Sequence, residues 1–217
     1  MIYNYITWNS GQLNMKTKTT LLLPDSYGAR GTGSQSIYPV LLLLSYGEGD
    51  SSSWIYYSDI VSVSEKNDVI VVLPETYHGC YSDVELSDGF DEYLNRELPD
   101  ILNRIIGLKI DRSNLFIAGN GKGGYMALTE ALRYPGNYKK TICLSCITYG
   151  EEKDFDQILL RAKNSRELPM IDFYCGEEDP TYDVCRSLYK ELYPYFCRRA
   201  AAAGMRRKDG GAEKEIR

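Results

Sequence analysis

The chain has 217 residues, of which 43% are apolar and 25% are charged, and its formal net charge is −5. This length suits one domain with a substantial core, and the composition is typical of a globular protein. The negative net charge argues against nucleic acid as a partner, because phosphate binding requires basic patches.

The first sixteen residues contain neither a basic start nor an apolar core, so they do not resemble a secretory signal. The longest apolar run, residues 40–44, is far too short to cross a bilayer. These features favour a cytoplasmic protein without a membrane partner.

Apolar runs recur along the chain and predict strands. They lie at residues 18–24, 39–45, 69–74, 115–119, 141–146 and 170–176, after an edge strand at residues 3–8. The middle four runs are almost continuously apolar, as expected for strands covered on both faces. Because no helix pattern separates the first two strands, we expect them to be antiparallel.

Helical patterns lie between the later strands. Residues 88–106 carry an apolar stripe, and Pro99 is expected to break or kink that helix. Two further helices are predicted at residues 122–133 and 183–196. Strands that alternate with helices predict an α/β fold, with a mostly parallel central sheet and helices on both faces.

The last twenty residues differ from the rest, since they lack aromatic side chains and hold seven basic and three acidic residues. We therefore expect one domain at residues 1–196 and a basic, disordered or non-native tail at residues 197–217.

The six cysteines are not spaced like a disulfide framework. Cys143 and Cys146 form a C-x-x-C pair, but the segment KTICLSC is typical of a buried strand, on which residues three apart face opposite sides. The chain has one histidine, His78, and no second C-x-x-C pair. We expect these thiols to pack in the core, and we expect no metal site.

Residues 119–123 read GNGKG, between a strand pattern and a helix pattern. This is the G-x-S-x-G spacing in which hydrolases present a nucleophilic serine on a sharp turn. The middle position is Gly121, which has neither oxygen nor sulfur to attack a carbonyl. Glycine does suit the strained backbone of such a turn.

Five segments resemble the tributyrin esterase and S-formylglutathione hydrolase (esterase D) family of α/β-hydrolases, over residues 5–196. They are SGQLNMKTKTTLLLPDS, PVLLLLSYGEGDSSSW, VVLPETYHGCYSDVELSDGFDEYLNRELPDIL, FIAGNGKGGYMALTEALRYP and FYCGEEDP. The resemblance implies an α/β-hydrolase fold that hydrolyses short acyl esters or thioesters through serine, aspartate and histidine, without a cofactor.

Carried over position by position, the family's nucleophile falls on Gly121 and its acid on Asp179. Its oxyanion donors fall on the backbone N–H groups of Gly47 and Lys122. The family's histidine follows the acid in a G-x-H loop, but no histidine follows His78 here. The resemblance thus predicts a truncated C-terminal part and an open sheet edge at residues 170–175, which invites pairing between copies of the chain.

Three functions remain open. The first is an esterase-family domain for a small acyl-ester substrate or analogue, impaired in catalysis. The second is a non-catalytic binding or scaffold protein that uses the sheet edge or the tyrosine-rich surface. The third is an enzyme with a relocated nucleophile, such as Cys80 beside His78. Ser45, near the oxyanion loop, is expected to shape that turn.

Overall fold

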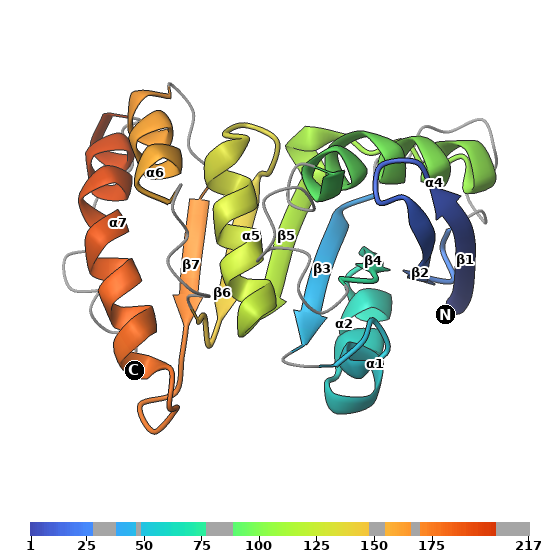
Figure 1. The fold of residues 1–217 in the computed structure, drawn as a ribbon. Coiled ribbons are helices and arrows are strands. Elements are labelled where there is room, and N and C mark those ends of the chain that lie inside the picture. Colours follow the sequence, from blue (N-terminus) through green and yellow to red (C-terminus); the bar gives the residue numbers. More distant parts are fainter. Residues whose placement is uncertain (28–37, 47–48, 77–88, 148–154, 166–169, 203–217) are drawn as a thin grey trace.

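The computed structural model describes residues 1–27, 38–46, 49–76, 89–147, 155–165 and 170–202. Within these ranges, seven strands form one sheet in the order β1-β2-β4-β3-β5-β6-β7 (Figure 1). The strands are β1 (Ile2–Ser10), β2 (Met15–Leu23), β3 (Val40–Tyr46), β4 (Ile70–Pro74), β5 (Leu115–Asn120), β6 (Lys140–Leu144) and β7 (Met170–Tyr174). β2 is antiparallel to β1 and β4, and the other pairs are parallel. The antiparallel opening pair and the mostly parallel sheet are therefore confirmed.

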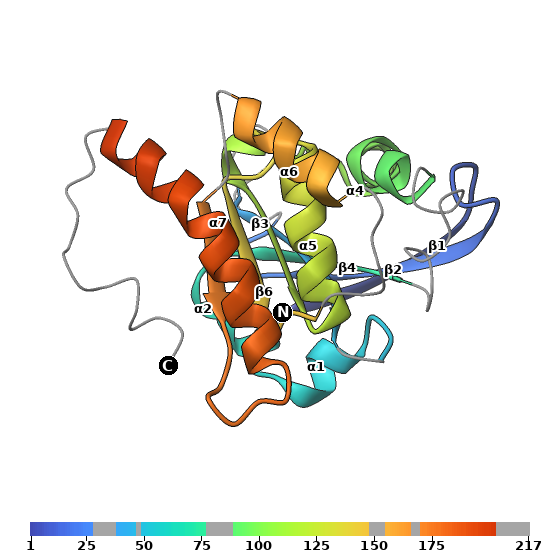
Figure 2. The ribbon, with the colours of Figure 1, turned by 60° about the vertical axis from the view of Figure 1, so that its left-hand side comes forward.

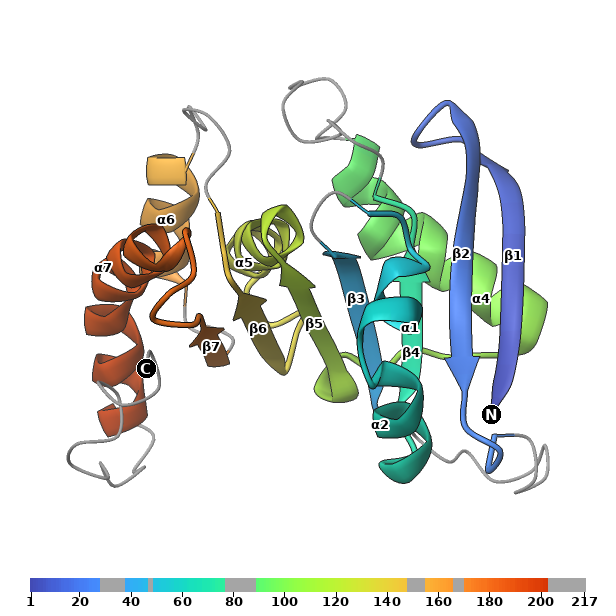
Figure 3. The ribbon, with the colours of Figure 1, turned by 90° about the horizontal axis from the view of Figure 1, so that it is seen from below.

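Helices cover both faces of this sheet. They are α1 (Ser53–Tyr57), α2 (Ile60–Lys66), α4 (Leu98–Ile106), α5 (Lys122–Arg133), α6 (Phe155–Asn164) and α7 (Tyr182–Ala202), with a short 3₁₀ turn at Arg112–Asn114. Seen from below in Figure 3, α1 and α2 lie on one face, while α4 and α5 lie on the other. α6 and α7 pack at the β7 end of the sheet (Figure 1), and Figure 2 shows α6 beside α5.

The helix predicted at residues 122–133 coincides with α5. The last predicted helix begins close to its expected position, but α7 continues beyond residue 196 to Ala202. The domain boundary after residue 196 stays a prediction. Within the described ranges, no helix is long and apolar enough to cross a membrane.

In the part of the chain that the structure describes, three clusters of buried side chains hold the layers together. The largest joins the sheet to α4 and α5 and contains Phe90 and Leu102, both fully buried. The second lies where α6 and α7 meet β6, β7 and α5. The third joins the sheet to α1 through Trp54, whose indole N–H donates to the Leu44 carbonyl at 2.7 Å. All five residues of β4 are buried, because both faces of the sheet are covered.

The helix predicted at residues 88–106 continues through Pro99, although its hydrogen-bond pattern changes. Residues 89–92 are helical, Tyr93–Glu97 form a π-helix (η1), and α4 follows directly. Pro99 is the second residue of α4, which directly follows the π turn, so the changed hydrogen bonding lies one turn before the residue that lacks an N–H. Of the expected break or kink, the break is absent, and a π turn precedes Pro99 instead.

Glu97, the last residue of η1, joins the β1–β2 hairpin to the helical layer through hydrogen bonds. Its Oε1 accepts from Trp8 Nε1 at 3.3 Å and from Gly11 N at 3.0 Å. Its Oε2 accepts from Ser10 Oγ at 2.5 Å and from Gln12 N at 3.3 Å. One carboxyl therefore satisfies four donors of the hairpin and fixes the antiparallel strands beside α4.

Candidate active site

The sharp turn between β5 and α5 lies at the carboxyl edge of the parallel strands, which is the lower edge in Figure 1. Asn120 ends β5 and Lys122 begins α5. Gly121 between them has φ 60° and ψ −117°. Side chains with a Cβ rarely adopt such a conformation, so the backbone is strained for any residue except glycine. The predicted strand–turn–helix is present, with Gly121 at its strained position.

Backbone hydrogen bonds tie this turn to the end of β6. Gly121 N donates to the Leu144 carbonyl at 2.9 Å. The Gly121 carbonyl accepts from Tyr125 N at 3.2 Å and from Ile147 N at 3.3 Å. Both backbone polar groups of Gly121 are therefore used within the fold.

The glycines around the turn allow α5 to pack directly against the sheet. A Cβ on Gly119 would lie 2.2 Å from the carbonyl carbon and oxygen of Gly123. A Cβ on Gly124 would lie 3.0 Å from Gly119 O and 3.1 Å from Leu144 O. The glycine-rich segment therefore serves a close approach between backbones, in addition to any role in catalysis.

Asp179, the predicted acid position, lies in the turn between β7 and α7. Its Oδ2 accepts from Ser145 Oγ at 2.6 Å. Its Oδ1 accepts from Thr181 N at 2.8 Å and from Thr181 Oγ1 at 2.7 Å. The Ser145 hydroxyl, followed by the Thr181 N–H and hydroxyl, holds the pKa of Asp179 below its ordinary value. Both carboxylate oxygens thus have donors from the chain itself.

Ser145 is a site residue that sequence reasoning missed. It follows β6 with φ 44°, a left-handed conformation that is rare for a residue other than glycine. Its N–H donates to the Tyr174 carbonyl at 2.8 Å. Because β5, β6 and β7 are neighbouring parallel strands, Gly121, Ser145 and Asp179 follow three adjacent carboxyl ends. Because the apolar run predicted a strand over residues 141–146, Ser145 lay inside that strand and no local signal marked it as a site residue.

We predict that Ser145→Ala raises the pKa of Asp179 toward its ordinary value, because the largest cause of the lowering is removed. A carboxyl with a depressed pKa adds stability above its ordinary pKa and loses that contribution as the pH falls through the folded value. The part of the acid destabilisation that comes from Asp179 should therefore become smaller in the variant, because the folded and unfolded states then bind its proton more nearly alike. NMR titration of the Asp179 carboxyl measures the shift directly.

Ser187→Ala provides the matched control, since the Ser187 hydroxyl bonds the Asp183 carbonyl and not Asp179. An Asp179 titration that is identical in both variants would contradict the assignment.

Other predicted residues are only partly placed. Lys122 is the first residue of α5, where backbone N–H groups have no partner within the helix, and its role as an oxyanion donor stays a prediction. Gly47, His78 and Cys80 lie outside the described residues. Ser45 lies in β3.

Of the two expectations for Cys143 and Cys146, burial in the core is confirmed and their placement on opposite faces is not. Cys143 and Cys146 are both fully buried, as expected for core packing. They share one cluster with Cys175 and Cys185, so the expectation that they face opposite sides is wrong. β6 ends at Leu144, and the left-handed turn at Ser145 redirects the chain before the second thiol. Within the described segments, no group of three cysteine, histidine or acidic residues is arranged to hold a metal ion.

The mostly parallel sheet, with helices on both faces and a strained strand–turn–helix at its carboxyl edge, defines an α/β-hydrolase fold. Residues 10–192 match the Esterase family, and the chain belongs to that family.

Named relatives agree with this assignment. An acetyl esterase from Caldicellulosiruptor saccharolyticus is 24% identical in an alignment 218 positions long, gaps included, that covers 82% of each chain. The structure of S-formylglutathione hydrolase (FrmB) from Staphylococcus aureus superimposes with a TM-score of 0.72 at 19% identity, covering 89% of this chain and 86% of that one. FphF, a fluorophosphonate-binding serine hydrolase from the same organism, gives a TM-score of 0.74 at 20% identity with the same coverage.

Proposed function

We propose that this chain is an esterase-family protein with a scaffold for short acyl esters or thioesters, and that glycine at the nucleophile position impairs its catalysis. The observation that carries the proposal is Gly121, which has the strained backbone of a nucleophile turn and no side chain. Acyl transfer through the protein needs an oxygen or sulfur lone pair at this point, and a base to remove its proton. Gly121 supplies neither.

The substrate class rests on the relatives. Their names, acetyl esterase and S-formylglutathione hydrolase, denote small acyl groups on an alcohol or a thiol. We propose the same class for this chain, either as a weakly hydrolysed substrate or as a bound analogue.

The surroundings of Asp179 are consistent with impaired catalysis. In a triad, the acid accepts a hydrogen bond from the histidine and holds the correct tautomer. Here Ser145 and Thr181 already donate to both oxygens of Asp179. We propose that this carboxylate now fixes the turn that begins α7.

Residual acceleration is expected to be small. Without a triad, binding and an oxyanion hole retain roughly 10³–10⁴-fold acceleration over water. Complete enzymes reach 10⁶–10¹⁷-fold. The unaltered chain should therefore show almost no hydrolysis of p-nitrophenyl butyrate beyond the spontaneous rate.

Two substitutions sharpen this assay. Gly121→Ser adds a hydroxyl and Gly121→Ala adds only the Cβ, so both impose the same backbone strain and differ by one oxygen. We expect both variants to hydrolyse little p-nitrophenyl butyrate, because a serine at position 121 would still have no histidine to remove its proton. Robust turnover by the unaltered chain, or a covalent adduct after treatment with an acylating inhibitor, would overturn the proposal.

A relocated nucleophile is tested by the same assay. If Cys80 carried the reaction, iodoacetamide would abolish turnover of the unaltered chain and Cys80→Ser would be inactive. Unchanged activity in Cys80→Ser removes this alternative.

The second candidate is a non-catalytic scaffold that pairs with another copy of the chain through β7. It is favoured by the sheet order, since among the described residues β7 pairs with β6 alone and Met170 and Tyr174 are exposed on it. A clean monomer in size-exclusion chromatography with light scattering would count against it.

A further inference from the structure

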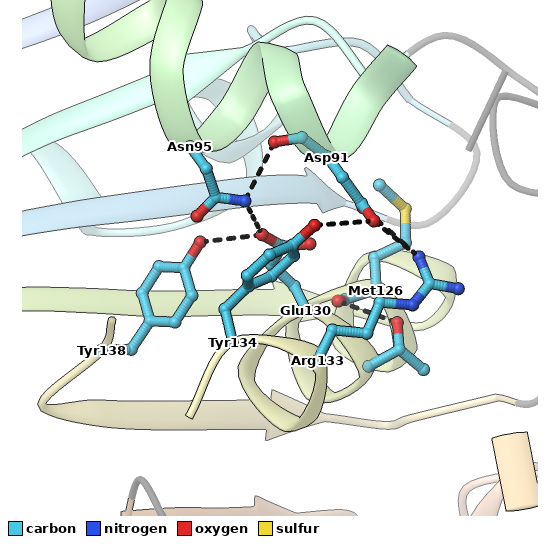
Figure 4. Close-up of polar contacts among 8 residues, drawn as sticks. Asp91, Asn95, Met126, Glu130, Arg133, Tyr134 and Tyr138 are labelled. Atoms are coloured by element: carbon cyan, nitrogen blue, oxygen red, sulfur yellow. Dashed lines mark hydrogen bonds and ion pairs between the residues drawn. The ribbon is translucent and has the colours of Figure 1, made fainter. Parts of the chain in front are cut away.

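Two acidic side chains are buried together where the helical segment 89–106 packs against α5. Glu130, on α5, is 1% exposed, and Asp91, in the helical turn before η1, is 7% exposed. Figure 4 shows the two carboxyl groups on facing helices, surrounded by Asn95, Arg133, Tyr134 and Tyr138. Burying two negative charges side by side is costly unless each is compensated.

Asp91 has the compensation that a carboxylate requires. Arg133 Nη1 lies 3.3 Å from Asp91 Oδ1 and 3.1 Å from Oδ2. The Tyr134 hydroxyl donates to Oδ2 at 3.3 Å. A guanidinium and a phenol together stabilise the ionised form of Asp91.

Glu130 is surrounded differently. Its Oε1 accepts from the Asn95 amide and from the Tyr138 hydroxyl at 3.2 Å, both of which are neutral donors. Its Oε2 is buried and no donor of the described chain reaches it. The Asp91 carboxyl lies close enough to interact with the Glu130 carboxyl. An ionised Glu130 would leave one oxygen without a donor and place a second negative charge beside the first.

We infer that the Asp91–Glu130 pair holds one proton: Glu130 is a neutral carboxylic acid whose Oε2 hydroxyl faces Asp91, while Asp91 is the carboxylate paired with Arg133. In this assignment Glu130 Oε2 carries a hydrogen and can donate it to Asp91. The single negative charge of the pair, on Asp91, is balanced by the guanidinium of Arg133. It makes the contact between α5 and the segment 89–106 a proton-dependent latch. Helix α5 begins at the Gly121 turn, so the latch holds the far end of the helix that positions the candidate site.

The neighbouring groups agree with this protonation state. Burial is the main cause that raises the pKa of Glu130 well above its ordinary value, and the charge of Asp91 adds to it. Burial and the two carboxyl groups also raise the pKa of Tyr138, and that of Tyr134 to about 12, so both phenols keep their protons and remain donors. Burial raises the pKa of Asp91 too, but Arg133 opposes that rise.

The sign of the pH dependence follows from the raised pKa. The folded protein binds the Glu130 proton more tightly than the unfolded chain does, so the stability from this proton is fully present below the ordinary glutamate pKa. It is lost as the pH rises through the folded pKa. Above that value, two carboxylates face one arginine and the helix contact weakens.

The test compares the unaltered chain with Glu130→Gln. Glutamine keeps an acceptor for Asn95 and Tyr138 and offers a permanent donor to Asp91. In urea unfolding from about pH 5 to about pH 8, the unaltered chain should lose stability relative to the variant. The unfolding equilibrium constants of the two should diverge by about tenfold or more, which is the change that one pKa unit represents.

Glu92→Gln is the matched control, because it removes a carboxyl one position from Asp91 that is paired with Arg96 at the surface. The free energy of unfolding of this variant should change with pH in the same way as that of the unaltered chain. Carbon-13 NMR of the Glu130 carboxyl in the unaltered chain provides an independent measurement and should show the acid form at neutral pH. An ionised Glu130 at neutral pH, or parallel profiles for Glu130→Gln and the unaltered chain, would overturn the inference.

Discussion

Replacing Gly119 with alanine is expected to destabilise the protein by about 3 kcal/mol or more, at or above the top of the usual range of about 1–3 kcal/mol for overpacked positions. The added Cβ would lie 2.2 Å from two backbone atoms of Gly123 and 2.7 Å from Gly124 N. Backbone atoms cannot rotate aside as a flexible side chain does, so α5 would have to move away from β5. That movement would also disturb the hydrogen bonds that tie the Gly121 turn to β6.

Gly11→Ala is the matched control. A Cβ at Gly11 meets no heavy atom within 4 Å, and the backbone N–H that bonds Glu97 is retained. Its effect should stay within about 0.5 kcal/mol, as for most surface substitutions. Urea unfolding followed by tryptophan fluorescence measures both variants, and equal midpoints would show that the approach of α5 to β5 is not as tight as described.

Replacing Glu97 with alanine is expected to cost about 3 kcal/mol or more. Four donors of the β1–β2 hairpin lose their acceptor at once, and hydrogen bonds to a charged group contribute about 1.5–3 kcal/mol each before solvent compensates the exposed ones. The hairpin should open locally before the rest of the sheet, because these contacts join it to the helical layer.

Glu97→Gln should cost less, since one carbonyl oxygen remains to accept. Glu92→Ala, which removes only an exposed i,i+4 ion pair, should cost about 0.5 kcal/mol or less. Urea unfolding ranks the three variants, and hydrogen exchange at Gly11 and Gln12 reports the hairpin itself. Unchanged protection of these two amides in Glu97→Ala would refute the role of Glu97.

Local patterns were sufficient for the elements with a strong period or a long apolar run. The seven strands of the described residues overlap the six apolar runs and the edge strand that were predicted, and α5 has the predicted bounds. The helices α1, α2 and α6 were not predicted. They have 5, 7 and 10 residues, so they show too few turns for a helical period to emerge from their sequence. The π turn before Pro99 also has no distinct sequence pattern.

The candidate site could be predicted only in part. Spacing alone located Gly121, because the glycine-rich turn between a strand and a helix is a local motif. The contact of Ser145 with Asp179 joins residues 34 positions apart and depends on β6 and β7 being neighbours. Nothing local to either residue indicates that pairing.

The sequence by itself determined the alternation of strands and helices and the absence of a nucleophile at residue 121, since the first depends on local periodicity and the second on covalent identity. Only the tertiary structure decided which distant polar groups meet. Glu97 accepts hydrogen bonds from the β1–β2 hairpin, Ser145 donates to Asp179, and the Asp91 carboxyl lies beside that of Glu130. The physical reason is that a hydrogen bond acts over about 3 Å. Strand order and helix packing decide which residues approach so closely.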